Sequence, residues 1–118
     1  MRRVPNSTLG PYPALCRSTV ENLGDVPLSD LVITDDIVTQ FSGLTPTDFV
    51  ATDGSLLANP DWDGARSNIL ADGQSLAFGA TGDVSITFTV TPGATTNVDN
   101  LAVANGTSPQ GDTVGDTS

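Results

Sequence analysis

The chain has 118 residues, of which four are Lys or Arg and fourteen are Asp or Glu, so its formal net charge at neutral pH is −10. This length suits one domain with a single core. The sequence has no His, and its four basic residues are all arginines. These absences exclude Ser-His-Asp and Cys-His catalysis, Schiff-base lysines, P-loop phosphate chemistry and His-ligated zinc. We therefore expect a non-catalytic protein, and we assign no catalytic, cofactor-binding or metal-ligating residue.

Charge is distributed unevenly along the chain. Residues 1–18 carry three arginines and no acidic residue, whereas residues 19–118 carry all fourteen acidic residues and one arginine. So acidic a surface repels phosphate backbones and anionic lipids, which argues against a nucleic-acid partner and against membrane insertion. The change in charge, together with three prolines in the first segment, predicts an irregular or disordered stretch over residues 1–17 and a folded domain over residues 18–118.

The first residues do not match an export signal. Arg2 and Arg3 suit its charged start, but the apolar run of about 7–15 residues that must follow is missing. No stretch approaches the roughly 18–20 apolar residues of a membrane span. Cys16 is the single cysteine, so the chain cannot form an internal disulfide.

The clearest structural signal is the alternation between Gly82 and Pro92. Apolar residues occupy positions 84, 86, 88 and 90, and serine or threonine occupies the positions between them. Strict period two with β-branched side chains predicts a half-buried strand with a solvated threonine face. We expect this strand to pack one side against a second sheet.

Shorter strands are expected on both sides of this segment. The predicted ranges are Ser18–Leu23, Ser29–Asp35, Thr47–Thr52, Gln74–Ala80, Val98–Asn105 and Asp112–Asp116, with one helical turn at most over Ile37–Phe41. In the strand over 98–105, a core face of Leu101 and Val103 and one of Ala102 and Ala104 are both compatible with the pattern. Turn dipeptides recur about every 8–12 residues, which is typical of a β-sandwich or barrel. We expect about six or seven short strands.

One motif is more specific than this composition. Residues 20–36 read VENLGDVPLSDLVITDD, which resembles the signature of the conserved-repeat domains of large prokaryotic surface proteins, the domain of unknown function eleven type. The segments Ala80–Gly82 and Val98–Ala102 also resemble parts of that family. The resemblance covers about residues 19–118, although residues 12–17 do not match the strand that normally precedes the motif.

The resemblance implies an immunoglobulin-like, Greek-key antiparallel sandwich, present as one truncated repeat of a secreted or cell-surface protein. It also implies neighbouring repeats as partners and a non-catalytic role as a spacer or adhesin-like scaffold. Two alternatives stay open: a calcium-dependent adhesion or carbohydrate-binding module, and a nonfunctional fragment of a larger surface protein.

Asn59–Gly64 is the first candidate site. Its sequence NPDWDG matches the first half of an EF-hand loop, with oxygen ligands at positions one, three and five and glycine at six. The twelfth position, which requires a bidentate Glu, is Leu70. The competing interpretation is an Asp-rich turn in which Trp62 caps the core, so weak calcium binding stays a hypothesis.

Other acidic residues allow further hypotheses. Asp35 and Asp36 end a predicted strand and could contribute to a divalent-cation site with another acidic loop. Asp61 with Asp63, or Asp35 with Asp72, would form a glycosidase pair only if they lay roughly 5–10 Å apart in a cleft and one of them had a raised pKa. The sequence marks no such cleft.

Three remaining candidates have simpler interpretations. Cys16 lies beside Arg17, but an inert thiol in an irregular segment is the simpler expectation. The aromatic residues could form a sugar-stacking platform, but most occupy core positions; they are Tyr12, Phe41, Phe49, Trp62, Phe78 and Phe88. Asn6 and Asn105 begin Asn-x-Ser/Thr triplets and would accept glycans only in a host that glycosylates them.

Overall fold

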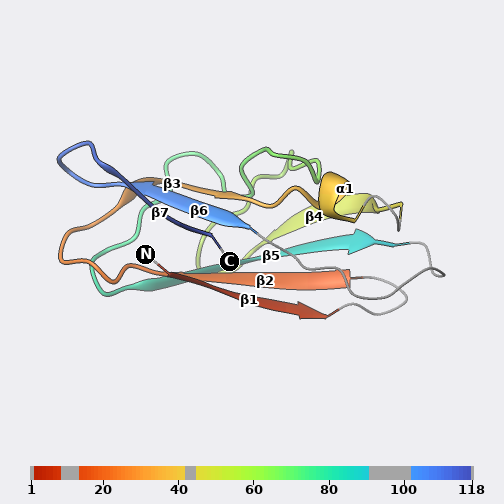
Figure 1. Cartoon of the computed structure of the whole chain (residues 1–118), viewed down its shortest axis with the longest axis horizontal. Helices are drawn as coiled ribbons and strands as arrows, with labels where there is room; N and C mark the ends of the chain where they lie inside the picture. The colour runs from red at the N-terminus through yellow and green to blue at the C-terminus, as the bar shows by residue number, and fades with distance from the viewer. Residues whose placement is uncertain (1, 9–13, 42–44, 91–101, 118) are drawn as a thin grey trace.

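A computed structural model describes residues 2–8, 14–41, 45–90 and 102–117, and these form two antiparallel sheets (Figure 1). The elements described are β1 (Arg2–Thr8), β2 (Ala14–Glu21), β3 (Ser29–Thr34), α1 (Ile37–Gln40), β4 (Thr47–Asp53), β5 (Thr81–Thr89), β6 (Val103–Thr107) and β7 (Thr113–Thr117). One sheet has the strand order β1-β2-β5-β4 and the other β3-β6-β7. The predicted β-rich class with short antiparallel strands is confirmed.

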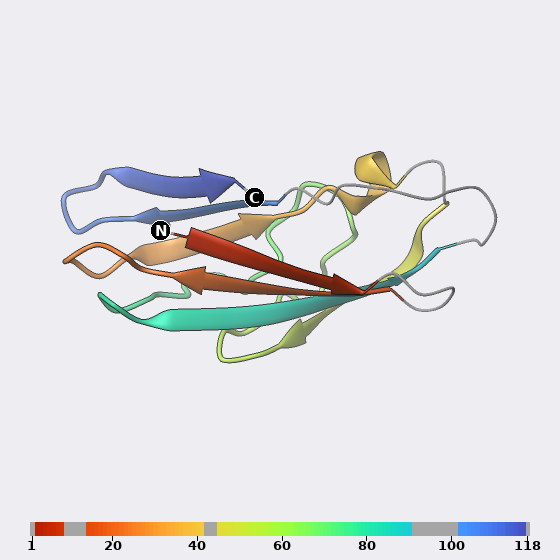
Figure 2. The same ribbon diagram turned by 60° about the horizontal axis from the view of Figure 1, so that its bottom comes forward.

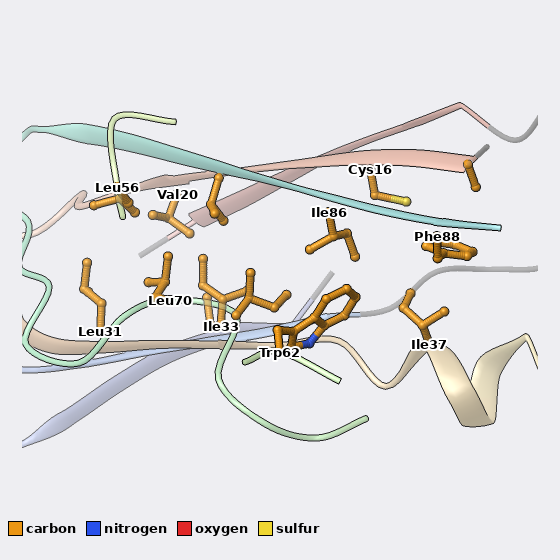
Figure 3. Packing of buried hydrophobic residues seen from close by; sticks show 14 of the residues in the cluster. Cys16, Val20, Leu31, Ile33, Ile37, Leu56, Trp62, Leu70, Ile86 and Phe88 are labelled. Atoms are coloured by element: carbon orange, nitrogen blue, oxygen red, sulfur yellow. The ribbon is translucent and has the colours of Figure 1, made fainter. Parts of the chain in front are cut away.

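The hydrophobic core lies between the two sheets. Figure 2 shows β3, β6 and β7 as a layer separate from the four-stranded sheet. In Figure 3, Val20 and Ile86 from the four-stranded sheet point toward Leu31 and Ile33 of β3. All four side chains belong to one buried cluster. Because buried side chains alternate along β2, β5 and β6, these strands turn one face toward the core and the other outward.

Strand β5 matches its prediction closely. Val84, Ile86 and Phe88 are buried, and the residues between them are half-buried on the opposite face. This outer face is less solvated than expected because β5 lies inside its sheet, with β2 on one side and β4 on the other. The expected packing of the apolar side against a second sheet is confirmed.

The prediction of an irregular segment over residues 1–17 is wrong for its described residues. β1 occupies residues 2–8, and β2 begins at Ala14 instead of at Ser18. The inward positions of β2 include Ala14, Cys16 and Ser18, which are small and weakly hydrophobic. The two-residue alternation of this strand is therefore not visible in the sequence. Pro5 is compatible with β1 because an edge strand has no hydrogen-bonding partner along one side.

Of the two core faces left open for the predicted strand over residues 98–105, the one with Ala102 and Ala104 is observed at β6. Ala102 and Ala104 are buried, whereas Val103 faces outward. Residues 98–101 of the predicted strand lie outside the described residues. β7 begins one residue later than predicted, and α1 confirms the single helical turn.

The predicted strand over residues 74–80 is wrong. Only Leu76 forms a bridge, with Leu28, and the segment otherwise follows turns. Phe78, which belongs to this predicted strand, is 67% exposed. The apolar residues Leu76 and Phe78 have the spacing of a strand, but only Leu76 is buried in the core.

The long connection between β4 and β5, residues 54–80, covers the outer edge of β3. The N–H of Leu31 donates to the carbonyl of Gln74 (3.0 Å), and the N–H of Ile69 donates to the carbonyl of Ile33 (2.8 Å). The side chain of Asn68 continues this pairing: its Oδ1 accepts from the N–H of Ile33 (3.0 Å) and its Nδ2 donates to the carbonyl of Leu31 (3.3 Å). These bonds satisfy a strand edge that could otherwise pair with another chain.

Replacing Asn68 by alanine is expected to lower the free energy of unfolding by about 1–3 kcal/mol, because backbone groups of β3 lose their partners. Urea denaturation followed by circular dichroism measures the change. Asp61→Ala is the control, since Asp61 lies exposed in the same connection. Equal stability of Asn68→Ala and the wild type would show that the side chain does not hold the edge.

Candidate functional site

The Asn59–Gly64 turn uses its polar groups within the protein. Asn59 Oδ1 accepts from the N–H of Asp61 (2.9 Å), and Asn59 Nδ2 donates to the carbonyl of Asn68 (2.9 Å). Asp63 Oδ1 accepts from the N–H of Ala65 (3.0 Å) and from Ser67 Oγ (2.9 Å). Oxygens that the calcium hypothesis requires as ligands therefore already accept hydrogen bonds that shape the loop.

Trp62 anchors this turn in the core. Its side chain is buried, and its ring meets Phe49 edge to face, with centroids 5.8 Å apart. This is the core-capping role considered for Trp62 in place of a ligand-binding role. Its Nε1 has no hydrogen-bond partner among the described residues. Gly64 allows the turn to lie close to the ring of Phe49. Any other residue would place its Cβ 2.4 Å from Cδ1 of Phe49.

The hydrogen bonds at Asp63 also change its acidity. The backbone N–H of Ala65 and the hydroxyl of Ser67 hold the pKa of this carboxyl below its ordinary value of 3.8. A general acid in a glycosidase pair needs a raised pKa. The surroundings of Asp63 therefore oppose the role of proton donor in the hypothetical pair with Asp61.

This shift predicts a pH-dependent contribution to stability. Because the pKa of Asp63 is lower in the folded state, its contribution is complete above the unfolded value and is lost as pH falls through the folded value. The melting temperature of Asp63→Asn should be lower than that of the wild type at neutral pH, and the two should converge well below pH 3.8. Asp61→Asn, at an exposed position of the same turn, is the control and should match the wild type at neutral pH. A difference that persists in acid would contradict the charge-assisted role of Asp63.

Asp35 and Asp36 have separate structural roles. Asp35 is buried, and its Oδ1 accepts from Gln40 Nε2 (2.7 Å). Asp36 is the N-cap of α1: its Oδ1 accepts from the N–H of Thr39 (3.2 Å), and its Oδ2 is 3.2 Å from Arg66 Nε. Burial raises the pKa of Asp36, but the bonds from Thr39 and Arg66 outweigh it and keep the pKa below 3.8.

Within the part of the chain that the structure describes, the acidic residues do not assemble into a metal centre. Across the described ranges, no group of three or more His, Cys, Asp or Glu side chains is placed to hold a metal ion. Of the second hypothetical glycosidase pair, Asp35 is buried whereas Asp72 is exposed in a turn. The structure therefore gives these carboxylates different surroundings and no shared site.

The sequence predicted that Cys16 lies in an irregular segment, but the structure places it in β2. It is 1% exposed on the inner face of β2, within the core cluster. A cysteine reacts when its thiol is deprotonated and accessible to solvent. Burial in apolar surroundings opposes both requirements. Cys16 is therefore a small core side chain, and its adjacent Arg17 points outward from the strand.

The aromatic residues that the structure describes do not form a common platform. Phe41 and Phe88 are buried and meet edge to face at 5.1 Å, and Phe49 packs against the same cluster. Phe78 is exposed away from this group, and Tyr12 lies outside the described residues. Of the two glycan triplets, Asn105 is half-buried in the central strand of its sheet.

Asn22 is a buried polar residue whose importance the sequence did not reveal beyond its turn propensity. Its Nδ2 donates to the carbonyls of Val26 (2.8 Å), Leu76 (3.3 Å) and Ala77 (3.3 Å), and its Oδ1 accepts from the N–H of Gly24 (3.1 Å). One side chain thus joins the β2–β3 turn to the end of the 54–80 connection. Its partners are distant in sequence, so only the assembled fold shows this role.

Comparison of the chain with protein-family profiles, curated proteins and solved structures found no match. In the described residues, no helix has the length and apolar character required to cross a membrane.

Proposed function

We propose that the chain is an immunoglobulin-like Greek-key sandwich acting as a non-catalytic structural module. The observation that carries this proposal is the strand order. Labelled A to G in chain order, the sheets β1-β2-β5-β4 and β3-β6-β7 become ABED and CFG. This is the arrangement of constant-type immunoglobulin domains. Many unrelated proteins share that architecture, so the order supports the fold more directly than the role.

The motif of residues 20–36 supports the proposed relationship to surface-protein repeats. In this fold its residues form the end of β2, the turn held by Asn22, and β3. Pro27 precedes the edge-forming segment, where a missing N–H is tolerated. The conserved-repeat resemblance thus coincides with a structural unit that joins the two sheets.

A structural role also fits the shape and surface of the molecule. Its principal dimensions are 48 × 25 × 20 Å, so the module is elongated. The net charge of −10 favours solubility and mutual repulsion between molecules. We infer a spacer or adhesin-like scaffold in a secreted or cell-surface protein, with neighbouring repeats as its partners.

Small-angle scattering of a polypeptide carrying one, two or three linked copies tests the spacer role. The maximum dimension should grow by an amount on the order of the 48 Å module length with each added copy. Melting of each copy should stay cooperative. Compact multimers whose maximum dimension barely increases would contradict the spacer role, while leaving the fold intact.

The calcium-dependent alternative makes a different prediction. An ion bound only by the folded state raises its stability in proportion to the logarithm of ligand concentration. Thermal melts with calcium and with chelator should therefore coincide for a structural spacer. A melting temperature that rises with calcium, and loses this rise in Asp63→Asn, would favour a calcium-dependent adhesion module.

A further inference from the structure

The chain contains three Asp–Gly peptide bonds, at Asp53-Gly54, Asp63-Gly64 and Asp72-Gly73. Such bonds are chemically labile because glycine has no side chain to hinder approach of its backbone nitrogen to the preceding carboxyl carbon. The approach requires a carboxylate that can turn toward the backbone and a peptide free to change conformation. The three sites differ sharply in both respects.

The first of these bonds is held by the fold. Asp53 Oδ1 accepts from the N–H of Ala58 (2.7 Å), and the N–H of Gly54 donates to the carbonyl of Leu56 (3.0 Å). A Cβ on Gly54 would lie 2.4 Å from the carbonyl oxygen of Asp83, so this peptide has little room to move. The nitrogen that would attack is already engaged.

Asp63-Gly64 is restrained in another way. The carboxylate of Asp63 accepts hydrogen bonds from Ala65 and Ser67, and Gly64 lies against the ring of Phe49. The carbonyl of Gly64 also accepts from the N–H of Val38 (3.0 Å). Reaching a reactive geometry would require breaking these contacts together.

Asp72-Gly73 has none of these restraints. Both residues are exposed, and Asp72 accepts no side-chain hydrogen bond from the described residues. Gly73 has φ +79°, and a Cβ built on it would meet no atom within 4 Å. We propose that Asp72-Gly73 is a site of spontaneous isoaspartate formation, and that the fold protects the other two Asp–Gly bonds.

The reaction needs only water. The Asp72 carboxylate first takes up a proton from water. The Gly73 nitrogen then attacks the side-chain carboxyl carbon, and the carboxyl hydroxyl leaves with the proton of the nitrogen as one water molecule. The resulting succinimide adds one water molecule at either carbonyl. Opening at the main-chain carbonyl leaves the chain continuing through the former side chain, whereas opening at the other carbonyl restores aspartate. The mass is unchanged overall.

This modification would affect the cover over β3. Isoaspartate adds one carbon to the main chain two residues before Gln74. The carbonyl of Gln74 accepts from Leu31, and its Oε1 accepts from the N–H of Leu57 (3.0 Å). The altered residue thus lies beside the contacts that anchor the 54–80 connection to the sheet.

The experiment ages the full chain in neutral buffer at physiological temperature and compares it with a fresh sample. Trypsin cleaves after Arg17 and Arg66, which separates residues 18–66, with two of the bonds, from residues 67–118, with the third. Each separated peptide is then methylated by an isoaspartyl methyltransferase. Isoaspartate is counted only in peptides whose mass before methylation equals that of the fresh peptide. This excludes isoaspartate from deamidation of an asparagine, which raises the peptide mass.

The aged peptide 67–118 is expected to contain roughly tenfold more mass-neutral isoaspartate than peptide 18–66, since hydrogen-bonded sites reach a reactive state less often. Asp72→Glu should abolish this product, because a glutamate would have to close a six-membered ring. Asp112→Glu is the matched control, exposed within the same tryptic peptide, and should leave it unchanged. Ageing in urea should remove the difference between the peptides.

Two results would overturn the proposal. One is an equal or larger amount of product in peptide 18–66 of the folded chain. The other is mass-neutral product that persists in peptide 67–118 of Asp72→Glu. If that variant does not fold, electron-transfer fragmentation of the aged wild-type peptide locates the isoaspartate directly, and any position other than residue 72 refutes the assignment.

Discussion

Replacing Phe88 by alanine is expected to lower the free energy of unfolding by about 3–5 kcal/mol, the usual cost of removing a buried aromatic ring. Phe88 is 1% exposed and contacts two other rings, with centroids 5.1 Å from Phe41 and 6.4 Å from Phe49. The cavity would open where α1 and β4 meet β5, so neighbouring groups would have little freedom to fill it. Urea denaturation measures the change.

Phe78→Ala is the matched control for that variant. Both residues belong to predicted strands, yet Phe78 is 67% exposed. Its removal should change the free energy of unfolding by no more than about 0.5 kcal/mol, as for other surface substitutions. Comparable losses in the two variants would contradict the placement of β5 and of the 74–80 segment.

Gly64→Ala is expected to lower the free energy of unfolding by about 2–5 kcal/mol. About 1–2 kcal/mol comes from placing an L side chain in the left-handed region, and about 1–3 kcal/mol from overpacking. The φ angle of Gly64 is +80°, and the new methyl group would lie 2.4–2.6 Å from three atoms of the Phe49 ring. Near-ultraviolet circular dichroism should also change, because Phe49 packs against Trp62.

Gly73→Ala separates backbone strain from steric overlap. Gly73 has almost the same φ angle, +79°, but no atom lies within 4 Å of the position that its new methyl group would occupy. We therefore expect a loss of only about 1–2 kcal/mol. If both variants lost the same stability, contact with Phe49 would not be the source of the additional cost at Gly64.

Strand β5 was predictable because the alternation over residues 84–90 is strict and its apolar side chains are large. The predicted start of β2 was four residues too late, since its inward positions include alanine, cysteine and serine, whose burial contributes little hydrophobic free energy. β1 gave no signal at all. It is a strand because β2 offers it an edge, and sequence pattern does not record such pairing.

At the Asn59–Gly64 turn, too, the sequence indicated the local structure but not the use of its side chains. The motif NPDWDG correctly indicated an ordered turn, but the ligand-like spacing of its oxygens did not determine their use. Asp63 accepts from its neighbours Ala65 and Ser67, and Trp62 fills space beside Phe49. Carboxylates and amides at this spacing serve equally well for a cation and for local N–H groups.

The sequence by itself determined the β-rich class, the position and inward face of β5, and the exclusion of histidine- and lysine-dependent chemistry, because these depend on composition and on local period. The tertiary structure decided the order of the strands, the covering of β3 by residues 54–80, and the burial of Asn22 and Cys16. It also decided which Asp–Gly bonds are restrained. Each of these depends on contacts between residues far apart in the chain, and no local pattern encodes the partner.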